Sequence, residues 1–452
     1  RQPRALRISP HWILGIYRNM HTGALEPFDP AYFFDQPLGI CVVVGGCGYF
    51  GSLLGEFLLS LAAPNGFVEQ VVIIDPAPLP ERLQDSLFDS YLQHVQISAT
   101  NHHGVKEAFQ ALPAPSRPIS SGAVFFTATT SSRELNLPTA RELHVNAAEN
   151  VYACASEAGM GAFVLTSTHN IGLDAGEGVS CIGYPEETKG FLDVYTFTKL
   201  EAEKRLISRG HSASEDHSRS IKSCALRPCG IFGPGEKFHF ERIRGLMEAG
   251  LGLTKIVPEA PFGMDWVFVA NVVDAHVLAA QKLLMESRTQ KNGGTIGGLD
   301  VADGKSFYVV GDGPSPSLQE FFAPVFFASG CTSSPNPLQI RIPIPAFFAY
   351  GFAFMCETVA LRCRLVPAIM RMEIRKIVKA HVFANDLATK SIGYRPRVST
   401  REGLQRCCQY ESRVHRQSNS SNRLRTWIFV GGACGALSAL SLYLYYGAAH
   451  KK

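Results

Sequence analysis

Charge is scarce in this sequence. Only 18% of its 452 residues are Asp, Glu, Lys or Arg, against roughly a quarter in an average soluble domain. Lysine and arginine exceed aspartate and glutamate by only four residues, 43 against 39, so we expect no nucleic-acid partner. Because 46% of the residues are apolar and the mean hydropathy is +0.04, the composition excludes a disordered chain and indicates some apolar surface that faces lipid.

Cysteine is also sparse. The 12 cysteines are far fewer than a disulfide-bonded scaffold needs, and they form no CxxC pair or Cys/His cluster with zinc-ligand spacing. We therefore expect reduced thiols and no metal site.

Two long apolar runs stand out against this background. Residues 427–449 form an uncharged run of 23, which as a helix would reach about 34 Å and cross a hydrocarbon core of roughly 30 Å. We expect a single transmembrane helix there; a buried C-terminal helix is the alternative. Arginines in the basic linker 411–426 outnumber the lysines after the run, which predicts a cytosolic catalytic part. The shorter run, 342–356, fits either a helix lying in the bilayer interface or a core helix.

From residue 38 to about residue 310, short β-branched runs alternate with longer helical segments. This alternation is typical of an α/β fold, here a Rossmann-type, doubly wound parallel sheet with a smaller C-terminal substrate domain and a C-terminal transmembrane helix. The expected strands are 40–44, 71–74, 123–127, 162–166, 223–226 and 307–310. The expected units are an N-terminal extension (1–37), a nucleotide-binding domain (38–310), a substrate or membrane-associated region (311–410), the basic linker (411–426) and the span (427–449).

The first strand ends in a glycine-rich turn that opens a helix. Gly45 permits a tight turn, Gly48 lets the backbone approach a pyrophosphate, and Gly51 lets the helix pack closely on the strand. The phosphates would rest on the helix N-terminus, at the backbone of Tyr49 and Phe50. The sequence thus predicts a dinucleotide cradle, which we define as residues 45–51; a ligand-free glycine turn is the alternative.

Asp75 ends the second strand, 24 residues after Gly51. A carboxylate at this place can accept hydrogen bonds from the adenosine ribose and would repel a 2′-phosphate, so NAD is favoured over NADP as cofactor. The alternative is a helix-capping aspartate.

Tyr195 and Lys199 lie four residues apart at the start of a strongly helical segment and so share one helix face. The spacing alone is weak evidence, but Thr168 follows a strand that delivers hydroxyls to the carboxyl edge of the sheet, where ligands bind in this architecture. A neighbouring ammonium and a cationic nicotinamide favour the phenolate, so Tyr195 could take the proton of an alcohol while Thr168 holds the substrate oxygen. Lys199 would also anchor the nicotinamide ribose. Alternatively, all three are structural residues.

These residues resemble the extended short-chain dehydrogenase/reductase superfamily, and most closely its 3-beta-hydroxysteroid dehydrogenase/isomerase branch, over about residues 38–405. The most specific further match is the run ALRPCGIFGPGE at 225–236; FVANVVDAH at 268–276 and LATKSIGY at 387–394 follow in the family's order.

The resemblance implies catalytic roles for Thr168, Tyr195 and Lys199, and it places Pro228 and Ile231 beside the nicotinamide. It also implies lipid-like substrates and membrane association, for which we expect the endoplasmic reticulum. The oligomeric state stays open, with a homodimer as one option.

Four positions depart from the family's pattern. Val44 stands where Thr or Ser is common, Ser98 occupies the place of an Asp expected near adenine, Phe126 replaces a His, and Ala270 replaces an Asp. Each change removes a polar contact, so the departures indicate a divergent member with weakened cofactor binding.

Three functions follow from these observations. We expect an NAD-dependent oxidoreductase that oxidises a hydroxyl of a steroid, sterol or similar lipid-like alcohol. One alternative is a nucleotide-sugar epimerase or dehydratase on the same scaffold. The other is a catalytically impaired, NAD-binding membrane scaffold or redox sensor, which the four departures favour and the intact Thr168, Tyr195 and Lys199 oppose.

Overall fold

The structure is a computed structural model of the chain. It describes residues 37–62, 67–113, 122–173, 193–207, 221–248, 254–257, 264–291, 301–315, 318–330, 342–379 and 382–419. The expected transmembrane run 427–449 and residues 1–36 lie outside the described residues.

A parallel sheet of seven strands forms the centre of the fold, in the order β10-β6-β5-β4-β1-β2-β3. The strands are β1 (Gly39–Val44), β2 (Val68–Ile74), β3 (Leu92–Val95), β4 (Ala123–Phe126), β5 (Ala162–Thr166), β6 (Lys222–Pro228) and β10 (Ser306–Val309). Six of them coincide with the strands expected from the sequence, and the doubly wound Rossmann-type fold is confirmed. Since later strands add on opposite sides of β1, the order reverses between β1 and β4, where ligands bind in such sheets.

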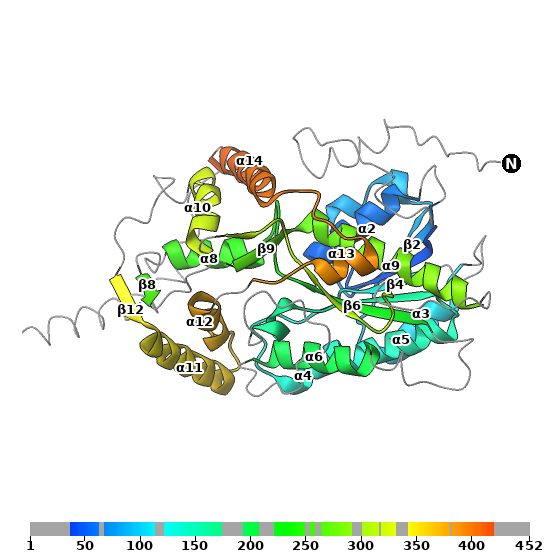
Figure 1. The fold of residues 1–452 in the computed structure, drawn as a ribbon, viewed down its shortest axis with the longest axis horizontal. Coiled ribbons are helices and arrows are strands. Elements are labelled where there is room, and N and C mark those ends of the chain that lie inside the picture. Colours follow the sequence, from blue (N-terminus) through cyan, green and yellow to red (C-terminus); the bar gives the residue numbers. More distant parts are fainter. Residues whose placement is uncertain are drawn as a thin grey trace, which may run out of the picture.

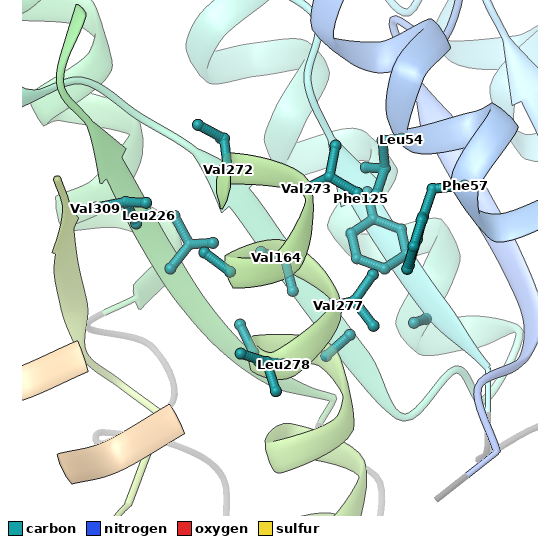
Figure 2. Packing of buried hydrophobic residues seen from close by; sticks show 14 of the residues in the cluster. Leu54, Phe57, Phe125, Val164, Leu226, Val272, Val273, Val277, Leu278 and Val309 are labelled. Atoms are coloured by element: carbon teal, nitrogen blue, oxygen red, sulfur yellow. The ribbon is translucent and has the colours of Figure 1, made fainter. Parts of the chain in front are cut away.

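Helices cover both faces of this sheet (Figure 1). One face carries α2 (Tyr49–Ser60), α9 (Val269–Lys291) and α13 (Asp386–Ile392), and the other carries α3 (His102–Gln110), α5 (Ala147–Glu157) and α6 (Val194–Ile207). The strands are apolar on both faces because both are buried. Figure 2 shows Phe125 and Val164 of neighbouring strands packed against Phe57 of α2 and Val277 of α9.

Short helices connect these elements. They are η2 (Glu81–Leu83), η3 (Ser86–Phe88), α4 (Leu137–Arg141), η5 (Glu142–Asn146) and η6 (His169–Gly172). Of these, η5 is a π-helical turn placed directly between α4 and α5.

The remaining elements build the C-terminal part. Two small sheets, ordered β11-β9-β7 and β12-β8, consist of β7 (Gly230–Phe232), β8 (Thr254–Val257), β9 (Met264–Phe268), β11 (Pro314–Ser315) and β12 (Ile342–Pro345). The helices are α8 (Phe238–Glu248), α10 (Leu318–Ala328), α11 (Ala346–Cys363), α12 (Arg371–Val378) and α14 (Thr400–Asn419). An aromatic cluster that includes Trp266, Phe321 and Phe322 joins β9 to α10. The helix α14 crosses the boundary at residues 410/411 that we expected between the substrate region and the linker.

The helix α11 is the one element in the described part of the chain that is long and apolar enough to cross a membrane, by length and composition. It begins at Ala346 and ends at Cys363, past the run expected from the sequence, and only 22% of it is buried. It is therefore not a core helix. Apolar side chains on it and just after it are exposed, namely Phe347, Phe348, Phe354, Met355, Val359, Leu361, Leu365 and Val366.

A buried ion pair fastens α6 to the sheet. Arg227 of β6 donates from Nε to Oε1 of Glu203 at 3.0 Å and from Nη2 to Oε2 at 2.6 Å, and both side chains are buried. Ser306 of β10 donates a further bond to Glu203 Oε2 at 2.9 Å. Because the charges are desolvated, the pair holds α6 in one position only as long as both partners are present.

We predict that Glu203→Gln lowers the free energy of unfolding by about 3–5 kcal/mol, because it removes the carboxylate charge opposite a buried guanidinium. Glu201→Gln on the same helix is the matched control. Its carboxylate pairs with the more exposed Arg141 and Arg205, so we expect a loss of about 1 kcal/mol or less. Urea denaturation measures both, and equal losses would contradict the fastening role.

Candidate active site

The cradle has the geometry that a dinucleotide requires. Gly45 has a φ of +84°, and a Cβ there would lie 2.5 Å from the Ala128 backbone nitrogen. A Cβ at Gly51 would collide with the Gly45 carbonyl oxygen. At Gly48, by contrast, a Cβ would meet only that same oxygen, at 3.3 Å. The loop therefore needs glycine at positions 45 and 51 for its own packing, while the space around Gly48 is less crowded.

The helix α2 starts directly at this loop. Gly48 is its N-cap, no side chain caps its first turn, and Tyr49 and Phe50 are its first two residues. The first N–H groups of a helix have no partner within the helix and carry the positive end of its dipole, so they can receive phosphate oxygens. The residues present fit a dinucleotide.

Asp75 lies beside the cradle at the end of β2. Its Oδ2 accepts from the Cys47 backbone N–H at 3.0 Å and its Oδ1 accepts from the Ala77 N–H at 2.9 Å. A carboxylate has about four lone-pair sites, so these two bonds leave acceptor capacity for ribose hydroxyls. The carboxylate thus also holds the backbone of the cradle, a contact that the sequence did not reveal.

Cys47 and His94 lie next to Asp75, with 3.9 Å between Cys47 Sγ and His94 Nε2 and 3.2 Å between His94 Nε2 and the Asp75 backbone carbonyl oxygen. Burial and the charge of Asp75 raise the pKa of the Cys47 thiol to about 12, so it stays protonated and is a poor metal ligand. Among the described residues, no group of three or more His, Cys, Asp or Glu side chains could hold a metal ion.

Ser98 follows β3, on the side of the sheet where adenine is expected. Its Oγ lies 2.8 Å from Thr100 Oγ1 and accepts from the Thr100 backbone N–H at 3.2 Å. These local contacts leave Ser98 as a half-buried hydroxyl in the loop before α3.

The helix α6 carries Tyr195 and Lys199. Asp193 caps its start, accepting from the Thr196 N–H and hydroxyl, each at 2.7 Å. Lys199 is buried and donates to the Thr166 carbonyl at 3.0 Å, while its Nζ lies 5.9 Å from the centroid of the Tyr195 ring. Burial lowers the pKa of Lys199 to about 7. The ammonium is therefore tied to the end of β5, on the side of the Tyr195 ring.

The structure brings the Tyr195 phenol and the Thr168 hydroxyl together. Burial raises the pKa of Tyr195 to about 12, and hydrogen bonds from Thr129 and Thr168 act in the opposite direction. Thr168 lies just past the carboxyl end of β5, where it caps η6 by accepting from the Asn170 N–H at 3.3 Å. A phenol with a raised pKa is protonated at neutral pH and needs a nearby positive charge to act as a base.

Pro228 and Ile231 border the same edge. Pro228 ends β6 in register with Val309, and its carbonyl accepts from His169 Nδ1 at 3.0 Å. Ile231 lies in β7 and is half-buried. Both are placed where the carboxyl ends of β5 and β6 meet the C-terminal part of the chain.

Two residues beside Tyr195 escaped the sequence analysis. His144 lies in η5 and packs edge-on against the Tyr195 ring, with 5.4 Å between centroids and 87° between planes. Thr129 follows β4 and lies 3.1 Å from His144 Nε2 through its hydroxyl. The only signal for Thr129 was its place after a strand, and no sequence pattern announces a π-helical turn.

The departures at Val44, Phe126 and Ala270 are all buried positions. Phe126 packs against Phe163 in the core, and Thr127 next to it donates to the Val44 carbonyl at 2.9 Å. The apolar side chains at these three positions thus lie in apolar surroundings. The Thr127 hydroxyl supports the turn at the end of β1.

The sequence profile of the 3-beta hydroxysteroid dehydrogenase/isomerase family matches residues 42–340, which is most of the part that builds the sheet and the site. The chain belongs to this family. Its relatives include the bovine (Bos taurus) short-chain dehydrogenase/reductase family 42E member 1, 30% identical over 79% of this chain and 84% of the relative. A decarboxylating sterol-4-alpha-carboxylate 3-dehydrogenase from Candida albicans is 26% identical over 82% of this chain and 96% of the relative.

Among solved structures, this family member is similar to UDP-glucuronic acid 4-epimerase from Bacillus cereus in complex with NAD. The TM-score is 0.56 with 16% identity, covering 83% of this chain and 99% of the epimerase. UDP-glucose 4-epimerase from Thermotoga maritima gives a TM-score of 0.54 with 17% identity, over 83% and 99%. At these identities the likeness establishes the fold.

We predict that Gly48→Ala and Gly45→Ala differ in how they affect thermal stability and dinucleotide affinity. Gly48→Ala should lower the melting temperature less than Gly45→Ala does, since its Cβ meets a single atom at 3.3 Å and its φ is not positive, yet it should lower the affinity for a dinucleotide. Gly45→Ala should lower both, because of its positive φ and its collision with Ala128. Thermal unfolding and calorimetric titration with NADH separate the two effects. Wild-type NADH affinity in Gly48→Ala would contradict the cradle's role.

Proposed function

We propose that this protein is an NAD-dependent dehydrogenase that oxidises a hydroxyl of a sterol, steroid or similar lipid-like alcohol. The observation that carries the proposal is the meeting of Tyr195, Thr168 and Lys199 at the carboxyl edge of a sheet whose first turn fits a dinucleotide. The names of two relatives point the same way, a sterol-4-alpha-carboxylate 3-dehydrogenase and, from Mycolicibacterium neoaurum, a 3-beta-hydroxysteroid dehydrogenase.

The residues that would hold NAD line this edge in order. The pyrophosphate would bind to the cradle, at Gly45, Gly48 and Gly51, and to the first turn of α2. Asp75 would bind the adenosine ribose, and Ser98 would lie on the adenine side. The nicotinamide riboside would be bordered by Lys199, Pro228 and Ile231. Bound NAD supplies a ring that accepts hydride from the alcohol carbon. The carboxylate of Asp75 disfavours the extra phosphate of NADP.

The protein's own groups would handle the proton. Thr168 would hold the substrate oxygen, and the Tyr195 oxygen would take the hydroxyl proton as hydride leaves the carbon. A protonated Lys199 and a cationic nicotinamide both favour the phenolate, which offsets the burial that raises the pKa of Tyr195. Alcohol oxidation needs the ionised phenol, so the rate of oxidation should rise with pH. Reduction of the ketone needs the protonated phenol, so the rate of reduction should fall as the pH rises.

We predict that Tyr195→Phe abolishes NAD reduction with 3-hydroxysteroids while leaving NADH affinity within about twofold, because the phenol oxygen takes part in proton transfer and not in cofactor binding. Absorbance of reduced nicotinamide, with a panel of hydroxysteroids and UDP-sugars, measures turnover. Tyr152→Phe is the control, because that hydroxyl donates to the Ile221 carbonyl away from the site. Retained turnover in Tyr195→Phe would remove this residue from the mechanism, and turnover with UDP-sugars alone would replace the sterol substrate.

We further propose that α11 lies in the cytosolic interface of a membrane, with the endoplasmic reticulum as the expected one, beside an anchor at residues 427–449. The helix exposes a continuous set of apolar side chains, of which Phe347 and Phe348 are about two-thirds exposed. Buried Glu357 pairs with Arg371 of α12 at 2.7 Å, so one side of α11 is held by the protein, which suits a helix that lies on the bilayer better than one that spans it. Arg362 and Arg364 are exposed at its end, where they can meet lipid phosphates.

We predict that two segments contribute separately to membrane binding. Deleting residues 427–452 should weaken the flotation of the protein with phosphatidylcholine/phosphatidylserine vesicles. Introducing four substitutions into this truncated chain should abolish flotation, because about 0.8 kcal/mol is lost per buried CH₂ withdrawn from the acyl region. The four substitutions are Phe347→Ser, Phe348→Ser, Leu361→Ser and Leu365→Ser. Phe327→Ser with Val414→Ser, two exposed apolar residues elsewhere, is the control. Unchanged binding of the fourfold variant in the truncated chain would contradict an interfacial α11.

A further inference from the structure

His276 lies near the start of α9 and is fully buried, although the residues around it on this helix are mostly apolar. Its Nδ1 lies 2.7 Å from the Val272 carbonyl oxygen, and its Nε2 lies 2.8 Å from Thr166 Oγ1 at the end of β5. Burial lowers the pKa of His276 to about 4, so the ring is neutral at pH 7. Since a carbonyl oxygen can only accept, the single ring proton is on Nδ1, and Nε2 accepts from the Thr166 hydroxyl.

Thr166 is held from both faces of the sheet. Its hydroxyl bonds to His276 of α9, on the face that also carries α2. Its carbonyl oxygen accepts from the Lys199 ammonium at 3.0 Å, and Lys199 belongs to α6, which covers the opposite face. A third bond, from the Ser167 N–H to the Leu226 carbonyl at 2.7 Å, keeps the same peptide within the sheet. Of these three bonds, the one to His276 ties the strand end to the helix layer that carries the cradle.

His276 also contacts the cradle directly. Its ring centroid lies 4.6 Å from that of Phe50, with 54° between the planes. Phe50 is the second residue of α2, where the pyrophosphate would bind. The two contacts of the imidazole predict different effects on the two halves of the cofactor, because Phe50 belongs to the phosphate side and Lys199 to the nicotinamide side.

The position of Lys199 depends on the strand end. Its ammonium uses one of three protons on the Thr166 carbonyl, and within the described part of the chain it makes no other hydrogen bond. Two protons are therefore left for the ribose hydroxyls of the nicotinamide half. Without an acceptor at His276, the buried Thr166 hydroxyl would have to turn to another partner, and its carbonyl and Lys199 would shift with it.

We propose that His276 is a positioning residue, which fixes the Lys199 ammonium at the nicotinamide ribose by holding the hydroxyl of Thr166. The inference rests on the proposed function, because that function assigns Lys199 to the nicotinamide half of NAD. It gives a role to the residue that ends the run FVANVVDAH, and it explains why a polar ring is buried among the apolar side chains of α9.

Calorimetric titration of the full-length protein with NADH and with ADP tests this role. ADP lacks the nicotinamide riboside, so its affinity reports on the cradle and not on Lys199. His276→Phe keeps an aromatic ring against Phe50 and removes the acceptor for Thr166. His276→Gln is the matched variant that does the reverse, because its side-chain amide can place an acceptor near the position of Nε2 without a ring.

We expect His276→Phe to weaken NADH binding about tenfold and to leave ADP binding within about twofold, because charge-assisted bonds to the ribose are lost. His276→Gln should stay within about threefold of the wild type for both ligands. Thr166→Val removes the same bond from its other end, so it should match His276→Phe, and the double variant should bind NADH no more weakly than either single variant.

Thr289→Val is the control on the same helix. It removes a hydroxyl that donates to the Met285 carbonyl at 2.9 Å near the far end of α9, so it should change neither affinity. Urea denaturation shows whether each variant is folded. If His276→Phe does not fold, Thr166→Val decides the question through the same comparison of NADH with ADP.

Equal losses of NADH and ADP affinity in His276→Phe would overturn the inference, because they would place the effect in the cradle. An unchanged NADH affinity in Thr166→Val would also overturn it, and so would losses that multiply in the double variant.

These titrations do not depend on turnover, so the inference and the proposed function can fail separately. A selective loss of NADH affinity in a protein that oxidises no sterol supports the positioning role and contradicts only the function. Sterol oxidation by the wild type, together with unchanged NADH affinity in the variants, contradicts only the positioning role.

Discussion

The hydrogen bond from the Lys199 ammonium to the Thr166 carbonyl, at 3.0 Å, fixes where the chemistry of this protein can take place. It joins the first turns of α6 to the carboxyl end of β5, so the residues that follow β5 and those that open α6 meet at one point. Tyr195 and Thr168 are brought together by this junction, and the ion pair of Glu203 with Arg227 holds the same helix one turn further on. The arrangement of the site therefore depends on the buried Lys199 ammonium and on its bond to the end of β5.

The shape of the cofactor side of the site is set by a different constraint, which is the close packing of the cradle between β1 and α2. Gly45 and Gly51 are needed because the backbone of β4's end and the loop's own carbonyl occupy the space of their side chains. Asp75 completes this side by bonding the loop, so the group expected to select the ribose also holds the cradle's shape. Loss of Asp75 would therefore act on both binding and specificity, and an experiment on this residue alone cannot separate them.

Much of this arrangement could be predicted from the sequence because it rests on local patterns. Apolar runs mark the strands around Val43 and Val164, and the glycine spacing marks the turn, since each feature is set by neighbours along the chain. His144 could not be found in this way. Its position beside Tyr195 depends on a helical turn widened by one residue and on contacts with Thr130 and Thr198, which lie 14 and 54 residues away. The exposure of α11 also required the structure, because an apolar run reads alike in a core and on a surface.

The central claim is that the Tyr195 oxygen, activated by Lys199, faces the reacting carbon of an alcohol over the nicotinamide. A structure of the protein with NAD and an unreactive hydroxysterol analogue tests it most directly. We predict the Tyr195 and Thr168 oxygens within hydrogen-bond distance of the sterol oxygen, and its carbon about 3–3.5 Å from the nicotinamide ring. A Tyr195 ring turned away from the nicotinamide, or separated from it by protein side chains, would contradict the account.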